Sequence, residues 1–170
     1  MMLLRPAEPG DEMAVAQVHV RSWQSAYRNL LPAEYLAQLR AEDRARRYTF
    51  GSADAREPVT VVAEEKGIVW GFATTAPARD PDALGQGELC ALYVDPDRWG
   101  RGVGAALVSA ARERLSSLGF GHAVLWLLVG NARAQRFYRI DRWAPDGARR
   151  TGSVWGATVD EIRWRRTLGG

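Results

Sequence analysis

The stretch that decides the fold runs from residue 88 to residue 108 and reads ELCALYVDPDRWGRGVGAALV. Its first part is almost continuously apolar, which predicts a β-strand buried on both faces. A spacer, DPDRW, follows, and Gly100, Gly102 and Gly104 then stand where an amphipathic helix begins. Because glycine costs conformational entropy, three glycines in five residues indicate a sharp turn or a backbone that a ligand approaches closely.

This glycine loop predicts an anion site. The first N–H groups of a helix have no internal partner, and the helix dipole adds about half a positive charge there. Glycines leave those amides uncovered, and Arg98 and Arg101 add charge, so a diphosphate fits the loop. The alternative is a glycine turn without a ligand, although one turn requires fewer glycines.

Two well-known diphosphate loops are excluded. A nucleoside triphosphate loop needs a lysine after its last glycine, and the one lysine of the chain is Lys66. GRGVGA matches the dinucleotide pattern, but that pattern follows its strand directly and precedes an acid by about 20 residues. Here a proline-containing spacer intervenes, and residues 120–126, FGHAVLW, hold no acid.

Composition bounds the rest of the interpretation. The 170 residues are predicted to form a single domain, 1–170, and 46% hydrophobic with 25% charged residues excludes wholesale disorder. The lone cysteine, Cys90, excludes an internal disulfide and suits a reducing cytoplasm. His19 and His122 share no metal-ligand spacing with acidic residues, so we expect no metal.

Charge and hydropathy favour a cytoplasmic protein without nucleic-acid or membrane partners. The net charge is +3 and the isoelectric point is about 9.4, but the arginines are spread along the chain rather than clustered. No uninterrupted apolar run is long enough to cross a bilayer. The apolar start, MMLL, meets an arginine and a proline at once, which is too short for a secretory signal.

Hydrophobic periodicity predicts strands and helices in the order β-α-α-β-β-β-α-β-α-β-β, an α/β fold with a mixed central sheet. The expected elements are a strand over 3–7, helices over 9–31 and 33–50, a hairpin over 58–77, a strand over 88–94, a helix over 103–119, a strand over 122–129, a helix over 131–139 and a hairpin over 152–168. The unit over 88–129 should be a right-handed parallel crossover. An exposed Trp155 or Trp164 on the last hairpin would fit the edge of a homodimer.

At this point the sequence resembles the GCN5-related N-acetyltransferase (GNAT) superfamily over roughly residues 3–166. The coenzyme A motif of that superfamily runs strand, V-x-P, then [QR]-x-x-G-x-[GA] at a helix start, as in LYVDPDRWGRGVGAALV. Its second motif, N-x-x-A-x-x-F-Y, is matched by Asn131, Ala134, Phe137 and Tyr138. The spacing SWQSAYRNLLP resembles one bacterial branch of small acetyltransferases.

The resemblance implies the acyl-CoA N-acyltransferase fold, with acetyl-CoA as co-substrate and no metal. It implies that acetyl passes directly to a primary amine of a small molecule or peptide. The pantetheine would lie in a gap between the strands over 88–94 and 122–129. The implied coenzyme-binding residues are Leu92, Tyr93, Val94, Arg98, Arg101, Gly102, Val103, Gly104, Asn131 and Phe137.

Two positions depart from the family pattern. Trp99 stands where the superfamily usually has glutamine or arginine, so Arg98 or Arg101 would supply the charge instead. Arg142 stands where the superfamily usually has a glycine before the next strand, a position that favours a residue tolerant of positive φ.

Two residues could carry the chemistry. Tyr138 is the candidate general acid for the leaving sulfur, because a phenol of pKa about 10 can protonate a developing thiolate at neutral pH. Glu88 is the candidate base, directly or through water, because a carboxylate at the mouth of an apolar sheet can have a raised pKa. The alternatives are a core tyrosine and a solvated acid at the end of a strand.

The acceptor would meet an aromatic stripe. His19, Trp23 and Tyr27 share one face of the first helix, and Trp23 and Tyr27 could hold a cationic amine by cation–π contact or simply pack in the core. We expect His122 to be structural and Cys90 to be a small core residue. Other readings are a different acyl donor, an alcohol acceptor, or a non-catalytic acyl-CoA-binding module of the same fold.

Overall fold

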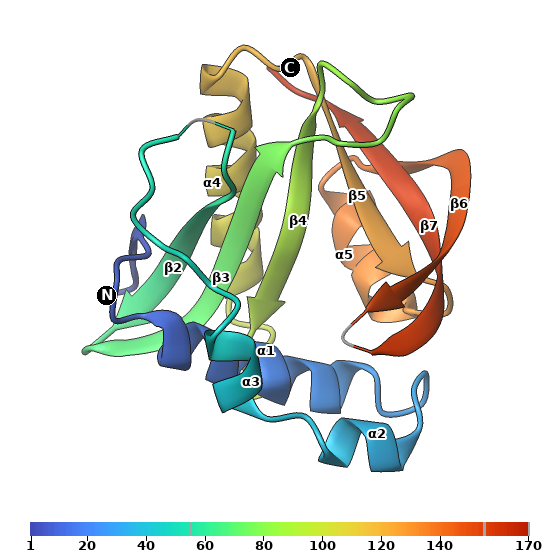
Figure 1. The fold of residues 1–170 in the computed structure, drawn as a ribbon. Helices are drawn as coiled ribbons and strands as arrows, with labels where there is room; N and C mark the ends of the chain where they lie inside the picture. The colour runs from blue at the N-terminus through green and yellow to red at the C-terminus, as the bar shows by residue number, and fades with distance from the viewer. Residues whose placement is uncertain (55, 155, 170) are drawn as a thin grey trace.

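The structure is a computed structural model that describes residues 1–54, 56–154 and 156–169. Its centre is a seven-stranded sheet in the order β1-β2-β3-β4-β5-β7-β6 (Figure 1). The strands are β1 (Leu3–Pro6), β2 (Val59–Glu65), β3 (Ile68–Pro77), β4 (Gly87–Val94), β5 (His122–Leu128), β6 (Ala144–Val154) and β7 (Ala157–Thr167). Neighbouring strands are antiparallel except β4 and β5, which are parallel, so the predicted mixed α/β sheet is confirmed.

The four predicted helices are present in order, two of them with changed bounds, and a short 3₁₀ helix lies in the predicted spacer. The helices are α1 (Glu12–Ala26), α2 (Ala33–Ala37), α3 (Ala41–Ala45), the 3₁₀ helix η1 (Pro96–Arg98), α4 (Val103–Ser117) and α5 (Ala132–Ile140). The first helix ends at Ala26 rather than Leu31, because the N–H groups of Leu30 and Leu31 both donate to the carbonyl oxygen of Tyr27 in a turn. The predicted second helix divides into α2 and α3 because Arg40 is extended.

Both faces of the sheet are covered by helices because side chains alternate along β3. Phe72 packs with Val15 and Val18 of α1, whereas its neighbour Ala73 belongs to the core around Leu107 of α4. Burying a valine, leucine or phenylalanine side chain stabilises the fold by about 1.5–3 kcal/mol. In the described part of the chain, no helix combines the length and the apolar character needed to span a bilayer.

The sequence predicts that β4 is buried on both faces, but in the structure the strand is partly exposed. The β3–β4 register shifts between Thr74 and Thr75, which leaves Cys90 as an extra residue opposite neither of them. Cys90 is exposed, so the expectation of a core cysteine is wrong. The physical reason is that β4 pairs with β5 only at Gly87 and Glu88 and then diverges from it (Figure 1).

The predicted terminal hairpin is confirmed as β6 and β7, but its tryptophan is not exposed. Trp164 has 1% of its surface exposed, because its pairing with Leu125 places it inside the sheet and its side chain packs in the core on the α4 face. Trp164 therefore cannot form a dimer edge, and Trp155 lies outside the described residues. The homodimer stays a prediction.

Candidate active site

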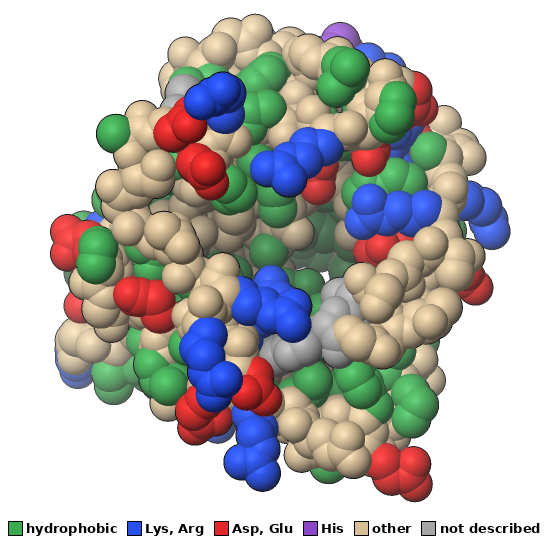
Figure 2. Space-filling view, viewed as in Figure 1, with side chains coloured by type: hydrophobic (Ala, Val, Ile, Leu, Met, Phe, Trp, Pro, Cys, Tyr) green, Lys and Arg blue, Asp and Glu red, His purple; other side chains and the backbone are tan. Residues whose placement is uncertain are grey.

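A cavity of about 410 Å³ opens where β4 and β5 diverge. Figure 2 shows that this face of the molecule is hollowed near its centre, with Lys and Arg side chains around the hollow. The cavity is lined by Ser22, Ala26 and Tyr27, by 89–94 of β4, by 98–100 and 102–105, by 125–127 of β5, and by Asn131, Arg133, Ala134, Phe137 and Tyr138.

The edge of β4 offers backbone hydrogen-bonding groups to this cavity. Asp95 donates its N–H to the carbonyl oxygen of Trp70 in β3, so alternate residues along β4 direct their backbone groups to β3 and to the gap. Leu92 and Val94 are the residues that face the gap. The carbonyl oxygen of Val94 accepts a 2.8 Å hydrogen bond from Nε1 of Trp99, which leaves the other groups for an extended ligand.

The glycine loop leaves helix amides open at the cavity. Gly102 is the N-cap of α4, has φ of +84°, and makes no side-chain cap hydrogen bond. A side chain at Gly102 would meet nothing within 4 Å but would be strained by the left-handed backbone. Gly104 has another role, because a Cβ there would lie 3.1 Å from Cε2 of Phe137. Gly104 thus lets α4 and α5 pack closely.

The two arginines predicted to supply charge at the loop are placed differently from that expectation. Arg98 lines the cavity, but its Nη1 donates to Oε2 of Glu65 at 2.7 Å and its guanidinium lies 4.1 Å from the ring centroid of Trp70. Arg101 is exposed and is not among the lining residues.

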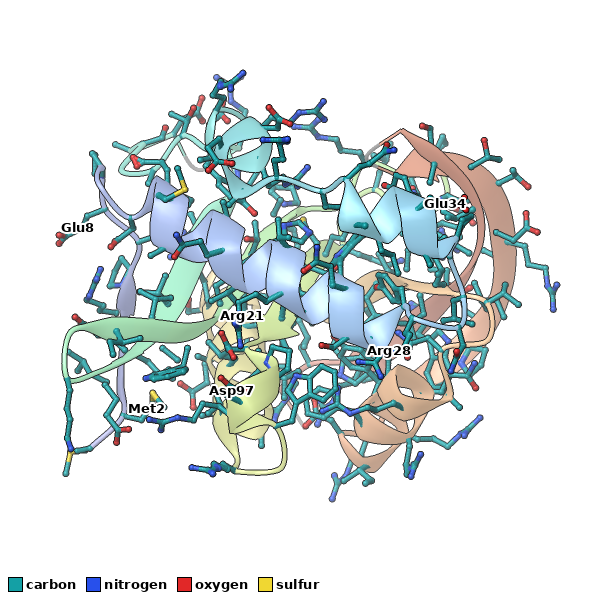
Figure 3. The ribbon with its side chains drawn as sticks, turned by 90° about the horizontal axis from the view of Figure 1, so that it is seen from below. Met2, Glu8, Arg21, Arg28, Glu34 and Asp97 are labelled. Atoms are coloured by element: carbon teal, nitrogen blue, oxygen red, sulfur yellow. The ribbon has the colours of Figure 1, made fainter. Side chains whose placement is uncertain are left out.

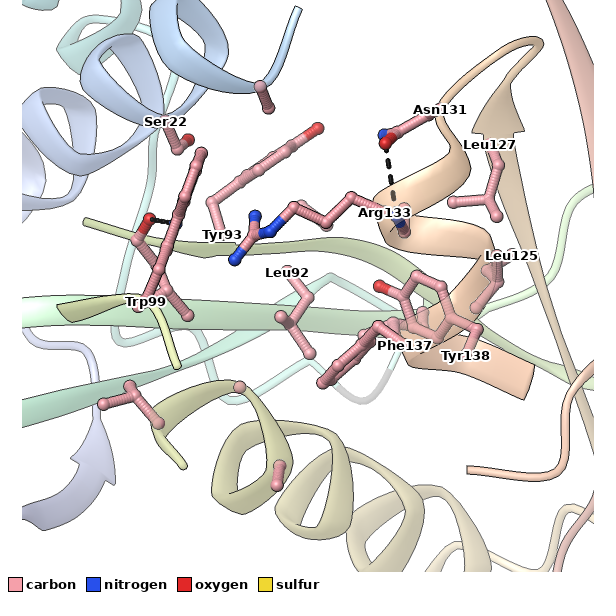
Figure 4. Close-up of a pocket in the computed structure, with 18 of the residues that line it drawn as sticks. Ser22, Leu92, Tyr93, Trp99, Leu125, Leu127, Asn131, Arg133, Phe137 and Tyr138 are labelled. Atoms are coloured by element: carbon pink, nitrogen blue, oxygen red, sulfur yellow. Dashed lines mark hydrogen bonds between the residues drawn. The ribbon is translucent and has the colours of Figure 1, made fainter. Parts of the chain in front are cut away.

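Arg133 is a cavity residue that the sequence interpretation missed. Figure 4 shows its side chain reaching from α5 across the cavity to Trp99, and its Cζ lies 3.6 Å from the Trp99 ring centroid. The signal that could have found it is helical spacing, since Arg133 and Phe137 are four residues apart and share a face of α5.

Asn131 and Tyr138 sit at opposite ends of α5. Oδ1 of Asn131 accepts the N–H of Ala134 at 3.2 Å, so this motif residue caps the helix. Tyr138 has 6% of its surface exposed, and its hydroxyl points into the cavity toward Leu92 (Figure 4). Burial raises the pKa of Tyr138 well above its ordinary value, so its hydroxyl stays protonated and can donate.

Glu88 lies where β4 and β5 part, paired with Val124, and is not itself among the lining residues. It is half-buried, and desolvation raises the pKa of its carboxyl. The nearby charge of Asp80 raises that pKa further, whereas Arg150 and Arg79 lower it. Glu88 is therefore a carboxyl of raised pKa at the closed end of the gap.

The aromatic stripe of α1 divides between the core and the cavity. Tyr27 lines the cavity, while Trp23, with 3% of its surface exposed, packs edge-on behind it with ring centroids 5.0 Å apart. His19 stacks on Tyr93 at 4.6 Å, and burial holds the pKa of His19 well below its usual range.

Trp126 on β5 is another residue of the cavity that the sequence interpretation missed. Its Nε1 donates to Oδ2 of Asp80 at 3.0 Å, and the guanidinium of Arg150 lies 4.1 Å from its ring centroid. Trp126 points to the opposite face from Leu125 and Leu127, which pack in the α4-side core. Within residues 1–54, 56–154 and 156–169, no group of three or more His, Cys, Asp or Glu side chains is placed to hold a metal ion.

Comparison with known proteins points in one direction. Residues 20–141 match the family model described as the acetyltransferase (GNAT) family. The chain is 33% identical over 131 residues to the uncharacterized N-acetyltransferase YuaI of Bacillus subtilis (strain 168), which covers 77% of this chain and 74% of that protein.

Two solved structures share the fold. A GCN5-related N-acetyltransferase structure from Rhodopseudomonas palustris superposes with a TM-score of 0.74 at 22% identity, covering 98% of this chain and 95% of that one. The structure of yncA from Salmonella typhimurium, solved with its cofactor acetyl-CoA, gives a TM-score of 0.68 at 20% identity, covering 100% of this chain and 95% of that one.

Proposed function

Because the chain belongs to the acetyltransferase (GNAT) family, we propose that it binds acetyl-CoA and transfers the acetyl group directly to a primary amine of a small molecule or peptide. The observation that carries the proposal is the cavity between the diverging strands β4 and β5, which has open helix amides at one end and the hydroxyl of Tyr138 inside it. The cytoplasm is the proposed place of action.

The residues present fit an acyl-CoA. Its diphosphate would meet the free amides of Gly102 and Val103 at the start of α4. Its pantetheine amides would pair with the edge of β4 at Leu92 and Val94, as an added strand does. Phe137 and the capping Asn131 line the opposite wall of the cavity.

Acetyl-CoA, when bound, supplies an acyl group activated as a thioester. Tyr138 would donate its proton to the leaving sulfur, since burial keeps its hydroxyl protonated. Glu88 would accept the proton of the acceptor amine, directly or through water. Each such proton transfer is worth about 10²–10⁴-fold in rate, and holding the amine beside the thioester contributes further.

The acceptor would lie against the wall that carries Tyr27. Its aromatic ring suits an amine that arrives as a cation. Trp23 would act on the acceptor by holding Tyr27 in place, since it packs behind that ring.

The test is calorimetric titration with acetyl-CoA, with NAD and ATP as controls. We expect selective micromolar binding that falls about tenfold, or about 1.4 kcal/mol, in Gly102→Val. Gly119→Val is the matched control, because Gly119 also has positive φ and open space but lies at the other end of α4. No binding of acetyl-CoA by the wild-type protein overturns the proposal.

An amine panel then separates an enzyme from a binding module. Release of free coenzyme thiol with any primary amine supports catalysis. Tight binding of acetyl-CoA without turnover on the whole panel favours the non-catalytic acyl-CoA-binding module.

A further inference from the structure

We propose that Arg133, positioned by the indole ring of Trp99, binds the diphosphate of the coenzyme from the side opposite the α4 amides. This inference rests on the proposed binding of acetyl-CoA. It assigns diphosphate binding to Arg133, which lies outside the glycine loop. It assigns a positioning role to Trp99, which departs from the family pattern of that loop.

Trp99 is held in one orientation. Its Nε1 donates to the carbonyl oxygen of Val94 at 2.8 Å, and its backbone N–H donates to Pro96 at 3.3 Å, so both ends of the residue are tied to the segment that precedes the glycine loop. The indole face is consequently presented to the cavity beside Gly100 and Gly102. An aromatic face in that place attracts a guanidinium and restricts its rotamers.

Arg133 occupies that face. Its Cζ lies 3.6 Å from the Trp99 ring centroid, close enough for the planar guanidinium to lie against the indole (Figure 4). Stacking uses the face of the guanidinium and leaves its N–H donors, which lie in its plane, free to bind an anion in two-point geometry.

The charge of Arg133 has no acidic partner in the part of the chain that the structure describes. The other arginine that lines the cavity, Arg98, is neutralised by Glu65 at 2.7 Å. Arg133 is exposed, so its guanidinium is open to a ligand that enters the cavity, and desolvation, with a smaller contribution from Arg136, lowers its pKa. A bound anion would offset that desolvation.

The position of Arg133 complements the helix amides. Trp99 leads directly into the loop whose amides begin α4, whereas Arg133 comes from the first turn of α5 on the other wall of the cavity. A diphosphate between them would receive backbone donors on one side and a guanidinium on the other. The cation therefore comes from α5, and Trp99 replaces a loop side chain that would have supplied it.

The experiment measures calorimetric dissociation constants of coenzyme A and of 3′-dephospho-coenzyme A for wild type, Arg133→Met and Arg136→Met. Arg136 lies on the same helix, is exposed, and does not line the cavity, so its variant loses the same charge. We expect Arg133→Met to weaken both ligands about tenfold and to flatten the salt dependence of binding, and Arg136→Met to stay within about twofold.

Two results overturn the assignment. Equal affinities in Arg133→Met and wild type mean that Arg133 binds no phosphate. If Arg133→Met weakens the binding of coenzyme A but not of 3′-dephospho-coenzyme A, Arg133 binds the 3′-phosphate rather than the diphosphate. Failure of the wild-type protein to bind either ligand is a different result, which overturns the proposed function itself.

Trp99→Leu and the double variant test the positioning role. If Trp99 orients Arg133, Trp99→Leu weakens coenzyme A severalfold, and adding Arg133→Met to it weakens binding little further. Additive losses overturn the positioning role while leaving Arg133 as a phosphate ligand. Thermal unfolding of each variant confirms that the measured protein is folded.

Discussion

Arg21 of α1 holds Asp95, the first residue after β4, in a two-point ion pair, with Nε 2.9 Å from Oδ2 and Nη2 3.1 Å from Oδ1. The same Nη2 donates to Asp97 at 3.1 Å, and Figure 3 shows Arg21 pointing from α1 toward Asp97. Oδ1 of Asp95 also accepts the N–H of Asp97, which caps η1. Helix α1 thus anchors the segment that leads into the glycine loop.

Replacing Asp95 should loosen that segment. We expect Asp95→Ala to lower the free energy of unfolding by about 1–2 kcal/mol, because it removes both a helix cap and a charge-assisted hydrogen bond. Asp95→Asn keeps an acceptor for the cap but loses the charge, so it should cost less. Urea unfolding measures both, and an unchanged midpoint in Asp95→Ala would show that the anchor contributes no stability.

Replacing Tyr138 should affect catalysis and not coenzyme binding. In Tyr138→Phe we expect kcat to fall about 10²-fold while the calorimetric affinity for acetyl-CoA stays within about twofold. Because burial raises the pKa of Tyr138, the wild-type rate should show no loss from tyrosine ionisation up to about pH 9. Tyr35→Phe, on α2 outside the cavity lining, is the control. A normal kcat in Tyr138→Phe would show that Tyr138 is not the general acid and only packs in the core.

Replacing Glu88 should change the pH dependence of the reaction. If Glu88 is the base, kcat/KM for the amine falls as pH drops through the Glu88 pKa, which desolvation holds above the ordinary glutamate value. Glu88→Gln should abolish this fall of kcat/KM at low pH and should lower the pH-independent value of kcat/KM about 10²-fold. A pH profile of the variant that parallels the wild type would exclude Glu88 as the base.

The same substitution should stabilise the fold at neutral pH. The pKa of Glu88 is raised on folding, so its favourable contribution is complete below the unfolded value of about 4.3 and is lost as pH rises through the folded value. Glu88→Gln keeps a neutral side chain at every pH. Its Tm should therefore exceed that of wild type at pH 7, and the difference should vanish below about pH 4.

Cys90 should react slowly although it opens onto the cavity. Cys90 is exposed where it lines the cavity, but desolvation by the surrounding protein, with a smaller contribution from the charge of Glu88, raises the pKa of its thiol to about 12. Only about one thiol in ten thousand is then ionised at pH 8, and the greater nucleophilicity of a high-pKa thiolate offsets part of this loss, so alkylation by iodoacetamide should be about 10²-fold slower than for free cysteine. Labelling at the rate of free cysteine would show that the sulfur is solvated.

Arg142 should be a strained residue. Its φ is 71°, and its N–H closes the end of α5 by donating to Arg139 at 3.0 Å. We expect Arg142→Gly to stabilise the protein by about 1 kcal/mol, because glycine takes left-handed backbone without strain. Arg142→Ala removes the same side chain but keeps the strain, so an equal gain in both variants would assign the effect to the side chain.

Features that depend on neighbouring residues were predictable. Lys66 and Gly67 both have positive φ in the hairpin between β2 and β3, as the Glu-Lys-Gly turn predicts. Asn131 caps α5 through the N–H three residues later. The glycine loop, the helix that follows it and the order of strands and helices likewise arise from local conformational preference and hydrophobic spacing.

Features that depend on distant partners were not predictable. The sequence alone does not distinguish Arg98 from Arg133. In the structure Arg98 forms an ion pair with Glu65, 33 residues away in the sequence, whereas Arg133 lies against the ring of Trp99. Trp164 lies in the core because its strand pairs with β5 on one side and β6 on the other. Nothing within a few residues of any of these side chains specifies its partner.

The sequence by itself determined the strands and helices, the fold class and the glycine loop, because backbone preferences and amphipathic periodicity act within a few residues of each position. Only the tertiary structure decided where the cavity opens, which arginine enters it and which tryptophan is buried. The cavity opens where β4 and β5 stop pairing, Arg133 lies against Trp99 of another element, and Trp164 is buried because β7 pairs with a strand on each side. Each outcome depends on residues that are far apart in the sequence, which backbone preference and periodicity do not specify.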